Sequence, residues 1–180
     1  MPTLLAACVV NALLSDRGNG ATAIDKRPVP GAVKVGRYGL FADVQVDRRH
    51  HGGLDQAIYA YAQDDADFWQ SELGRPLLPG WFGENLRVSG IDVNAARVGA
   101  RWRVGSTVEL EVMSPRTPCA TFARWVGGAD ARGWVKRFSE EGRLGAYLRV
   151  AKTGTVEARD DIEVLSVPEH AQTMLELFRS

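Results

Sequence analysis

Arg116 and Cys119 lie close together in the segment 114–119, whose sequence is SPRTPC. The preceding segment, Thr107–Met113, alternates apolar and polar residues, which is typical of a half-buried strand. The two prolines of SPRTPC fix the backbone and remove amide donors, so strand pairing should stop there. The sequence therefore predicts a thiol on a stiffened turn at the end of a strand, with a guanidinium nearby.

Two local features favour the thiolate form of Cys119. A helix is predicted over Ala120–Val126, directly after the thiol, and the N-terminal end of a helix carries partial positive charge. Arg116 adds a full positive charge, and the thiolate is the form that binds metals or attacks electrophiles. Most free cysteines are simply small buried residues, and the local pattern is compatible with that alternative too. Cys8, inside an apolar strand, is expected to be such an inert packing residue.

A second polar group surrounds two histidines, His50 and His51, which precede the pair Gly52–Gly53. The nearby acidic residues are Asp43, Asp47 and Asp55. Imidazole and carboxylate groups are usual ligands of divalent ions, so a zinc or iron site is one hypothesis. The spacing matches no metal motif, and adjacent residues of a strand point to opposite faces. The glycine pair is more typical of a backbone conformation or close approach that a Cβ atom would forbid.

The composition excludes several classes of function. Acidic and basic residues balance at 22 each, so no overall field attracts nucleic acid or an anionic membrane. The apolar run Leu4–Leu14 is too short to span a bilayer and lacks signal-peptide features, which predicts a first strand in a cytoplasmic protein. Two cysteines are too few for a disulfide framework or a four-thiolate iron–sulfur cluster. The motifs of dinucleotide-binding proteins, P-loop proteins, serine hydrolases and zinc proteases do not occur.

The elements that must position these residues are short strands separated by glycines, with a few helices. The further strands expected are 33–35, 57–61, 88–93, 101–104, 145–151 and 162–167. The further helices expected are one capped by Asp64 or Asp65 that ends at Gly74, one over 131–140, and a short one opened by Pro168. This pattern predicts a mainly β fold, a closed β-barrel of short, mostly antiparallel strands with decorating helices. A single domain over residues 1–180 is expected.

Six motifs occur in a fixed order along the chain. They are Thr22-Ala23-Ile24 with Lys26, Pro28-Val29, Gly39-Leu40 with Asp43, His51-Gly52-Gly53, Phe82-Gly83-Glu84-Asn85-Leu86, and Pro115-Arg116 with Pro118-Cys119. This set resembles the MOSC domain, named after the C-terminal part of molybdenum cofactor sulfurases, and most of all the bacterial proteins that confer resistance to 6-hydroxylaminopurine. Ala42 departs from the family, which usually has glycine there, and some relatives carry a longer helical extension at the C-terminus.

The resemblance implies a β-barrel that binds a molybdopterin cofactor, with Cys119 as the protein ligand to molybdenum and as the catalytic residue. The cofactor-binding residues that it implies are Thr22, Lys26, His51, Asn85 and Arg116. The implied reaction is the two-electron reduction of a small N-hydroxylated substrate, such as 6-hydroxylaminopurine or an amidoxime. A separate reductase or flavoprotein would supply the electrons, because the chain has too few cysteines for its own iron–sulfur relay.

Two other functions use the same residues. As a sulfur carrier, the protein would hold a persulfide on Cys119 and pass the sulfur on, which needs an exposed thiol of low pKa. As a non-catalytic module, it would store or deliver molybdenum cofactor without turnover. The reductase and the non-catalytic cofactor module need the same pocket, so the sequence is compatible with both. The loops 15–32 and 74–86 are expected to set the identity of the substrate.

Overall fold

The computed structural model describes residues 1–17, 20–46 and 52–180. The strands are β1 (Thr3–Val10), β2 (Leu14–Asp16), β3 (Gly20–Thr22), β4 (Lys26–Pro28), β5 (Val33–Gly36), β6 (Gly39–Leu40), β7 (Ile58–Ala62), β8 (Leu86–Ser89), β9 (Arg101–Val104), β10 (Val108–Pro115), β11 (Ala146–Lys152), β12 (Gly154–Val156) and β13 (Ile162–Ser166). The helices are α1 (Gln63–Leu73), α2 (Ala120–Gly127), the short 3-10 helix η1 (Gly128–Asp130), α3 (Trp134–Glu141) and α4 (Met174–Arg179).

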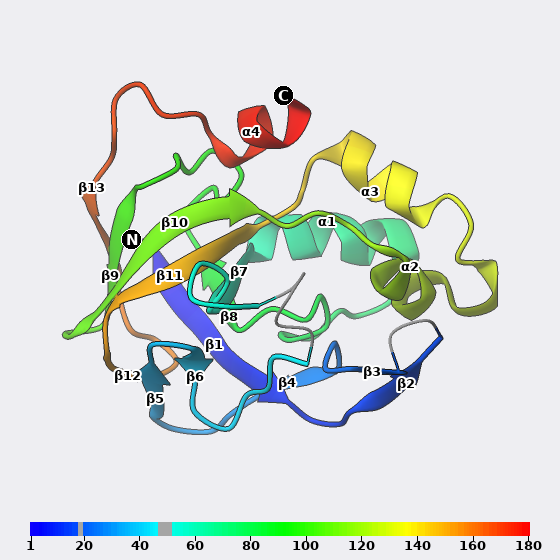
Figure 1. Ribbon diagram of the computed structural model, residues 1–180, viewed down its shortest axis with the longest axis horizontal. Helices are drawn as coiled ribbons and strands as arrows, with labels where there is room; N and C mark the ends of the chain where they lie inside the picture. The colour runs from blue at the N-terminus through cyan, green and yellow to red at the C-terminus, as the bar shows by residue number, and fades with distance from the viewer. Residues whose placement is uncertain (18–19, 47–51) are drawn as a thin grey trace.

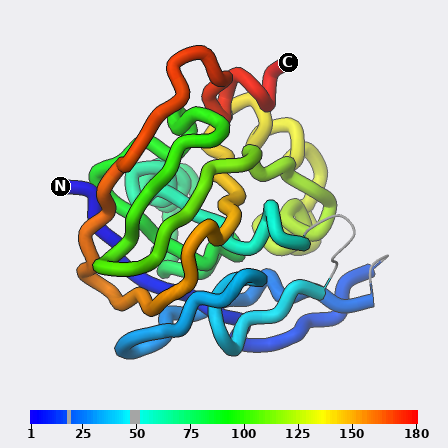
Figure 2. The backbone as a smooth tube through the Cα atoms, turned by 60° about the vertical axis from the view of Figure 1, so that its left-hand side comes forward, coloured from blue at the N-terminus to red at the C-terminus, as the bar shows by residue number. Residues whose placement is uncertain are grey.

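The largest sheet has eight strands in the order β13-β9-β10-β11-β7-β8-β1-β4 (Figure 1). Its neighbouring strands are antiparallel except for β7 and β8, which run parallel. Parallel neighbours need a long crossover, and α1 with the loop that follows it supplies one. The sheets β12-β5-β6 and β2-β3 are smaller. The segment from β2 to β6, blue to cyan in Figure 2, lies along the edge of the large sheet that β4 forms.

The prediction of a closed barrel is wrong. The edges of the large sheet are β13 and β4, which do not pair with each other, so the sheet is open. An isolated bridge between Thr3 and Asp161, with backbone hydrogen bonds that join Pro2 and Leu4 to residues 159–162, brings the start of β1 beside the start of β13. These contacts form no ladder between the two strands. Short strands with glycine turns occur in barrels and open sheets alike, so the pattern could not decide closure. The coarser prediction, mostly antiparallel β structure with few helices, is confirmed.

The core contains two clusters of buried apolar side chains that meet at β7. All five residues of β7 are buried, and successive side chains of a strand point to opposite faces. Ile58 and Ala60 belong to the first cluster, with the inward residues of β9 and β10. Tyr59 and Tyr61 belong to the second cluster, which is rich in aromatic rings from α1, α2 and α3. β7 is therefore the central strand, and its tyrosines face the helices.

Two helix starts differ from the sequence predictions. α1 begins before both candidate aspartates and has no side-chain cap. Asp65 is buried and pairs with Arg143 at 2.7 Å, so its carboxylate binds a distant residue instead of capping the helix. α4 begins well after Pro168, at a capping box formed by Thr173 and Glu176. Tertiary contacts of Asp65 thus override the expected cap of α1, whereas α4 starts at a local capping box that the prediction overlooked.

Candidate functional site

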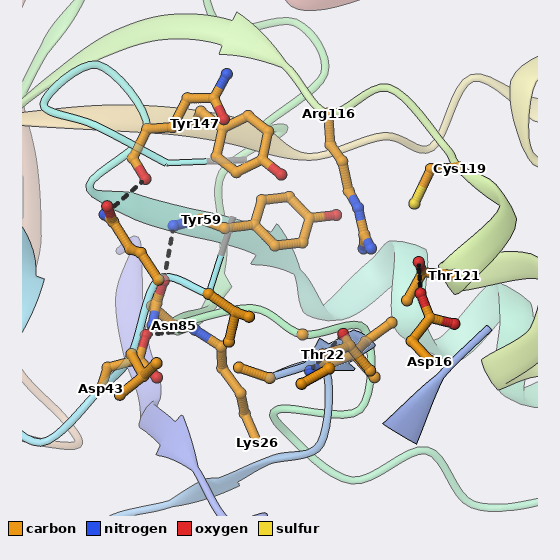
Figure 3. A pocket seen from close by; sticks show the side chains of 18 of the residues that line it. Asp16, Thr22, Lys26, Asp43, Tyr59, Asn85, Arg116, Cys119, Thr121 and Tyr147 are labelled. Atoms are coloured by element: carbon orange, nitrogen blue, oxygen red, sulfur yellow. Dashed lines mark hydrogen bonds and ion pairs between the residues drawn. The ribbon is translucent and has the colours of Figure 1, made fainter. Parts of the chain in front are cut away.

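A pocket lies where the β2–β3 hairpin, the loop after β6, strands β7 and β11 and the segment before α2 meet (Figure 3). It encloses about 870 Å³, counted out to its open mouth. Five of the residues predicted from the sequence line it, namely Thr22, Lys26, Asn85, Arg116 and Cys119. The sixth, His51, lies outside the described residues. We call this cavity the Cys119 pocket.

Cys119 is the N-cap residue of α2, in an extended backbone conformation that precedes the first helical residue. β10 pairs with β11 as far as Pro115, slightly further than predicted. A proline is tolerated at the last residue of a strand, because the amide donor that it lacks is not needed where the ladder ends. The remaining residues of SPRTPC then carry the chain to the helix. The thiol is partly exposed, as its place at the pocket wall requires.

Cys8 has the inert role that the sequence predicts. Its side chain is fully buried in β1. Burial, and to a lesser degree the negative charge of Glu84, raises the pKa of the Cys8 thiol to about 12. Cys8 therefore stays protonated at neutral pH, and Cys119 is the cysteine that lines the pocket.

Arg116 places a buried positive charge in the Cys119 pocket. One of its Nη atoms donates a hydrogen bond to the Phe82 carbonyl. Its guanidinium carbon lies 5.0 Å from the centre of the Tyr59 ring and 4.8 Å from that of Phe122. No carboxylate of the described residues is within ion-pair distance of it. Because a guanidinium keeps its charge and a buried charge needs a counter-ion, this end of the pocket favours an anionic ligand.

Lys26 and Asn85 are held by Asp43, which lies in the loop after β6. The carboxylate of Asp43 pairs with the Lys26 ammonium, accepts a 2.7 Å hydrogen bond from the Asn85 side chain, and accepts a 2.9 Å bond from the Val10 amide. The Asn85 amide also donates to a β1 carbonyl and accepts from the Tyr59 backbone. The charge of Lys26 is thus matched by Asp43, whereas no carboxylate among residues 1–17, 20–46 and 52–180 pairs with Arg116.

A further contact joins the β2–β3 hairpin to α2 across the pocket. Asp16 of β2 accepts a 2.6 Å hydrogen bond from the Thr121 hydroxyl and forms an ion pair with Arg124. Thr22 of β3 uses its hydroxyl to accept a 3.3 Å bond from the Ile24 amide, which shapes the turn beyond the hairpin. The hairpin is therefore fixed beside the residue that carries the thiol.

Tyr59 and Tyr147 form an aromatic wall of the pocket, with ring centres 5.3 Å apart. The two residues are direct partners in the β7–β11 ladder. The Tyr59 hydroxyl donates to the Leu144 carbonyl at 2.7 Å. Burial is the main cause that raises the pKa of both phenols above the usual value, so both are neutral at physiological pH. The wall offers a flat, uncharged surface next to Arg116 and Cys119.

Sequence reasoning missed several residues of the Cys119 pocket as site residues, among them Asp16, Asp43, Tyr59, Thr121 and Tyr147. Asp43 belongs to one of the ordered motifs, which is the signal that could have found it. The others have no local signal, since Asp16 and Thr121 meet across 105 residues of sequence.

Two exclusions hold for residues 1–17, 20–46 and 52–180. No three His, Cys, Asp or Glu side chains among them converge to hold a bare metal ion. The hypothesis of a zinc or iron site rested on His50 and His51, which lie outside these ranges. None of the helices in the described part of the chain is both long and apolar enough to cross a membrane.

Comparison with known proteins identifies the family. Residues 47–163 match the model of the MOSC domain. The uncharacterized protein YflK of Bacillus subtilis is 35% identical over 145 residues, which cover 81% of this chain and 64% of YflK. A protein named "Reductase" from Gibberella moniliformis is 30% identical over 167 residues, which cover 90% of this chain and 29% of that protein. The chain thus spans less than two thirds of either curated relative.

A solved structure shares the fold. The crystal structure of YiiM from Geobacillus stearothermophilus superposes with a TM-score of 0.79 at 24% identity, covering 99% of this chain and 83% of that one. At this identity the likeness concerns the fold alone. The family model, in contrast, spans well over half of the sequence and includes the segment with Arg116 and Cys119. The chain belongs to the MOSC domain family.

Proposed function

We propose that the Cys119 pocket binds molybdenum cofactor and that the protein uses it to reduce N-hydroxylated compounds. The proposal depends on one observation: a partly exposed thiol and a buried guanidinium with no carboxylate partner among the described residues line the same pocket. Molybdenum cofactor has a soft metal centre and an anionic phosphate. A thiolate suits the first and a guanidinium suits the second, so the donor set fits the group.

Each part of the pocket has a defined task in this proposal. Cys119 is the ligand to molybdenum, and Arg116 binds the anionic part of the cofactor. Arg116 is already oriented by the Phe82 carbonyl and by two aromatic rings, so little side-chain freedom is lost when an anion binds. Thr22, Lys26 and Asn85 line the pocket, the last two fixed by Asp43. His51 is expected to complete the set.

The cofactor, when bound, supplies the two-electron chemistry that removes the substrate oxygen. Overall, R–NHOH takes up two electrons and two protons, the N–O bond breaks, and R–NH₂ and water leave. With only two cysteines, one of them buried in the core, the chain cannot carry its own iron–sulfur cluster. A separate reductase or flavoprotein is therefore proposed as the electron donor. The name of the Gibberella relative and the association of MOSC domains with molybdenum cofactor support the reductase proposal.

Arg116→Gln is expected to lower the pterin bound to the purified protein by at least about tenfold, the loss of a charge-assisted hydrogen bond to an anion. Bound pterin is measured by fluorescence after oxidative release. The matched control is Arg137→Gln, because Arg137 pairs with Glu72 on the surface. Pterin retention equal to that of the wild type in Arg116→Gln would contradict the proposal, provided that thermal unfolding shows both variants to be folded.

The sulfur-carrier function is the second candidate, and the partial exposure of Cys119 beside a cation favours it. A carrier would accept persulfide sulfur on Cys119 in protein that contains no molybdenum. A non-catalytic cofactor carrier would instead retain molybdenum and fail to reduce substrate with any electron donor. Metal content and turnover, measured on one preparation, separate the three functions.

A further inference from the structure

Residues 143–145, which lie between α3 and β11, anchor both tyrosines of β7. The Tyr59 hydroxyl donates a 2.7 Å hydrogen bond to the Leu144 carbonyl, and the Tyr61 hydroxyl donates a 2.9 Å bond to the Arg143 carbonyl. Residues 143–145 belong to neither α3 nor β11, so a regular ladder of hydrogen bonds does not fix these two carbonyls. Other contacts decide where the carbonyls lie.

Asn94, in the loop between β8 and β9, supplies those contacts. Its side-chain oxygen accepts hydrogen bonds from the backbone amides of Leu144 and Gly145, at 2.8 and 3.1 Å. Its side-chain nitrogen donates a 2.7 Å bond to Asp65 of α1. The Asn94 amide thus uses its acceptor on segment 143–145 and its donor on α1, and this pairing of both groups fixes which way the amide faces.

Asp65 completes the arrangement from α1. Its carboxylate is buried, and the oxygen that does not bind Asn94 accepts a 2.7 Å hydrogen bond from Arg143. The two ends of segment 143–145 are therefore tied to one carboxylate, directly through Arg143 and through Asn94 at Leu144 and Gly145.

Segment 143–145 also packs tightly against β7. Gly145 has a φ of +70°, and a Cβ atom on it would lie 2.5 Å from the Ala60 carbonyl oxygen and 2.8 Å from the Tyr59 ring. Only glycine allows so close an approach in this conformation. A shift of segment 143–145 therefore reaches the Tyr59 ring by direct contact as well as through the Tyr59 hydroxyl.

The Tyr59 ring in turn borders Arg116 (Figure 3). The guanidinium carbon of Arg116 lies 5.0 Å from the centre of this ring. The attraction between a cation and a ring depends on their distance and on the orientation of the ring, so the position of Tyr59 affects that of the guanidinium. Asn94 and Asp65 are not among the residues that line the Cys119 pocket, yet they lie at the other end of this chain of contacts.

We propose that Asn94 is a positioning residue for the anion-binding end of the Cys119 pocket. It acts through segment 143–145 and Tyr59 on the Arg116 guanidinium, and it touches no ligand itself. Asp65 orients Asn94. The identity of the anion as part of molybdenum cofactor rests on the proposed function, whereas the positioning of Arg116 rests on contacts within the protein.

The test is isothermal titration calorimetry with pyrophosphate, on the full chain purified from a host that cannot make the cofactor. Arg116→Gln removes the charge and should weaken pyrophosphate binding by at least about tenfold. Asn94→Ala and Tyr59→Phe keep Arg116 but each remove one link, and each should weaken binding by about fivefold. Because the two links act in series, the double variant should again lose about fivefold, not the roughly 25-fold of independent sites.

Ile162→Ala separates a loss of positioning from a general loss of stability. Ile162 is a buried residue of β13 and does not line the Cys119 pocket. Its truncation leaves a cavity in the core and should lower the midpoint of thermal unfolding at least as far as Asn94→Ala does. Ile162→Ala should still bind pyrophosphate like the wild type.

The possible failures of the two proposals are distinct. Wild-type affinity in Asn94→Ala, effects of Asn94→Ala and Tyr59→Phe that multiply in the double variant, or equal weakening by Ile162→Ala would each overturn the positioning role alone. Absence of pyrophosphate binding by the wild type, or binding that Arg116→Gln leaves unchanged, would instead refute the anion site, and with it the proposed function.

Discussion

Cys119→Ser is expected to abolish both molybdenum binding and reductase activity, whereas Cys8→Ala keeps both. A free serine hydroxyl does not ionise near neutral pH and is a harder ligand than a thiolate, so we expect it to hold molybdenum far less tightly than sulfur does. Cys8 is fully buried in β1, and its raised pKa keeps it a thiol. The measurements are molybdenum per chain by mass spectrometry and reduction of an amidoxime with a chemical electron donor.

The two cysteine variants control for each other. Cys8→Ala perturbs the core and so reports any general effect of a small packing defect. Cys119 is partly exposed, and its replacement should leave the midpoint of thermal unfolding close to that of the wild type. Equal molybdenum content in the two variants would contradict the role of Cys119 as the ligand to molybdenum.

Glu84→Ala is expected to lower the free energy of unfolding by about 3–5 kcal/mol, because it leaves a buried charge without its partner. Glu84 and Arg87 are both fully buried and form an ion pair. Glu84 also accepts hydrogen bonds from the Gly80 and Phe82 amides at 2.7 and 2.9 Å. These contacts fix the loop whose Phe82 carbonyl orients Arg116, so the same variant should bind less pterin.

Urea denaturation measures this difference, and Glu163→Ala is the matched control. Glu163 pairs with Arg103 on the surface, where both side chains are largely accessible to solvent. Loss of such a pair costs about 0–1 kcal/mol. A free energy of unfolding for Glu84→Ala within the range of the control would show that the buried pair does not hold this loop.

The parts of the fold that depend on local pattern were predictable. Alternation over Thr107–Met113 indicated a strand, and β10 contains nearly all of that segment. The helix predicted directly after Cys119 is α2. Closure of the barrel was not predictable, because it depends on whether β13 and β4 meet, and no local signal records the partner of an edge strand. The start of α4 was misplaced for a different reason, because the local capping box at Thr173 is a stronger signal than Pro168 and was overlooked.

The candidate site, like the fold, was predictable only in part. Five of the six predicted site residues, among them Lys26, Arg116 and Cys119, line one pocket. The tertiary contacts that decide whether the charge of Lys26 or of Arg116 has a partner could not be predicted from the sequence. Asp43 pairs with Lys26, and nothing in the spacing of the motifs indicated that Arg116 would lack a carboxylate partner among the described residues. Tyr147 was predicted only as part of a strand, yet it forms part of the aromatic wall of the Cys119 pocket.

The most direct test of the central claim is the molybdenum content of wild-type protein purified from a host that makes molybdenum cofactor. Protein from an otherwise identical host that cannot make the cofactor provides the baseline. We predict near-stoichiometric molybdenum, accompanied by pterin, in the first preparation and neither in the second. A folded protein with no molybdenum from the competent host, and with a Cys119 thiol that accepts persulfide sulfur, would contradict the reductase function and favour the sulfur carrier.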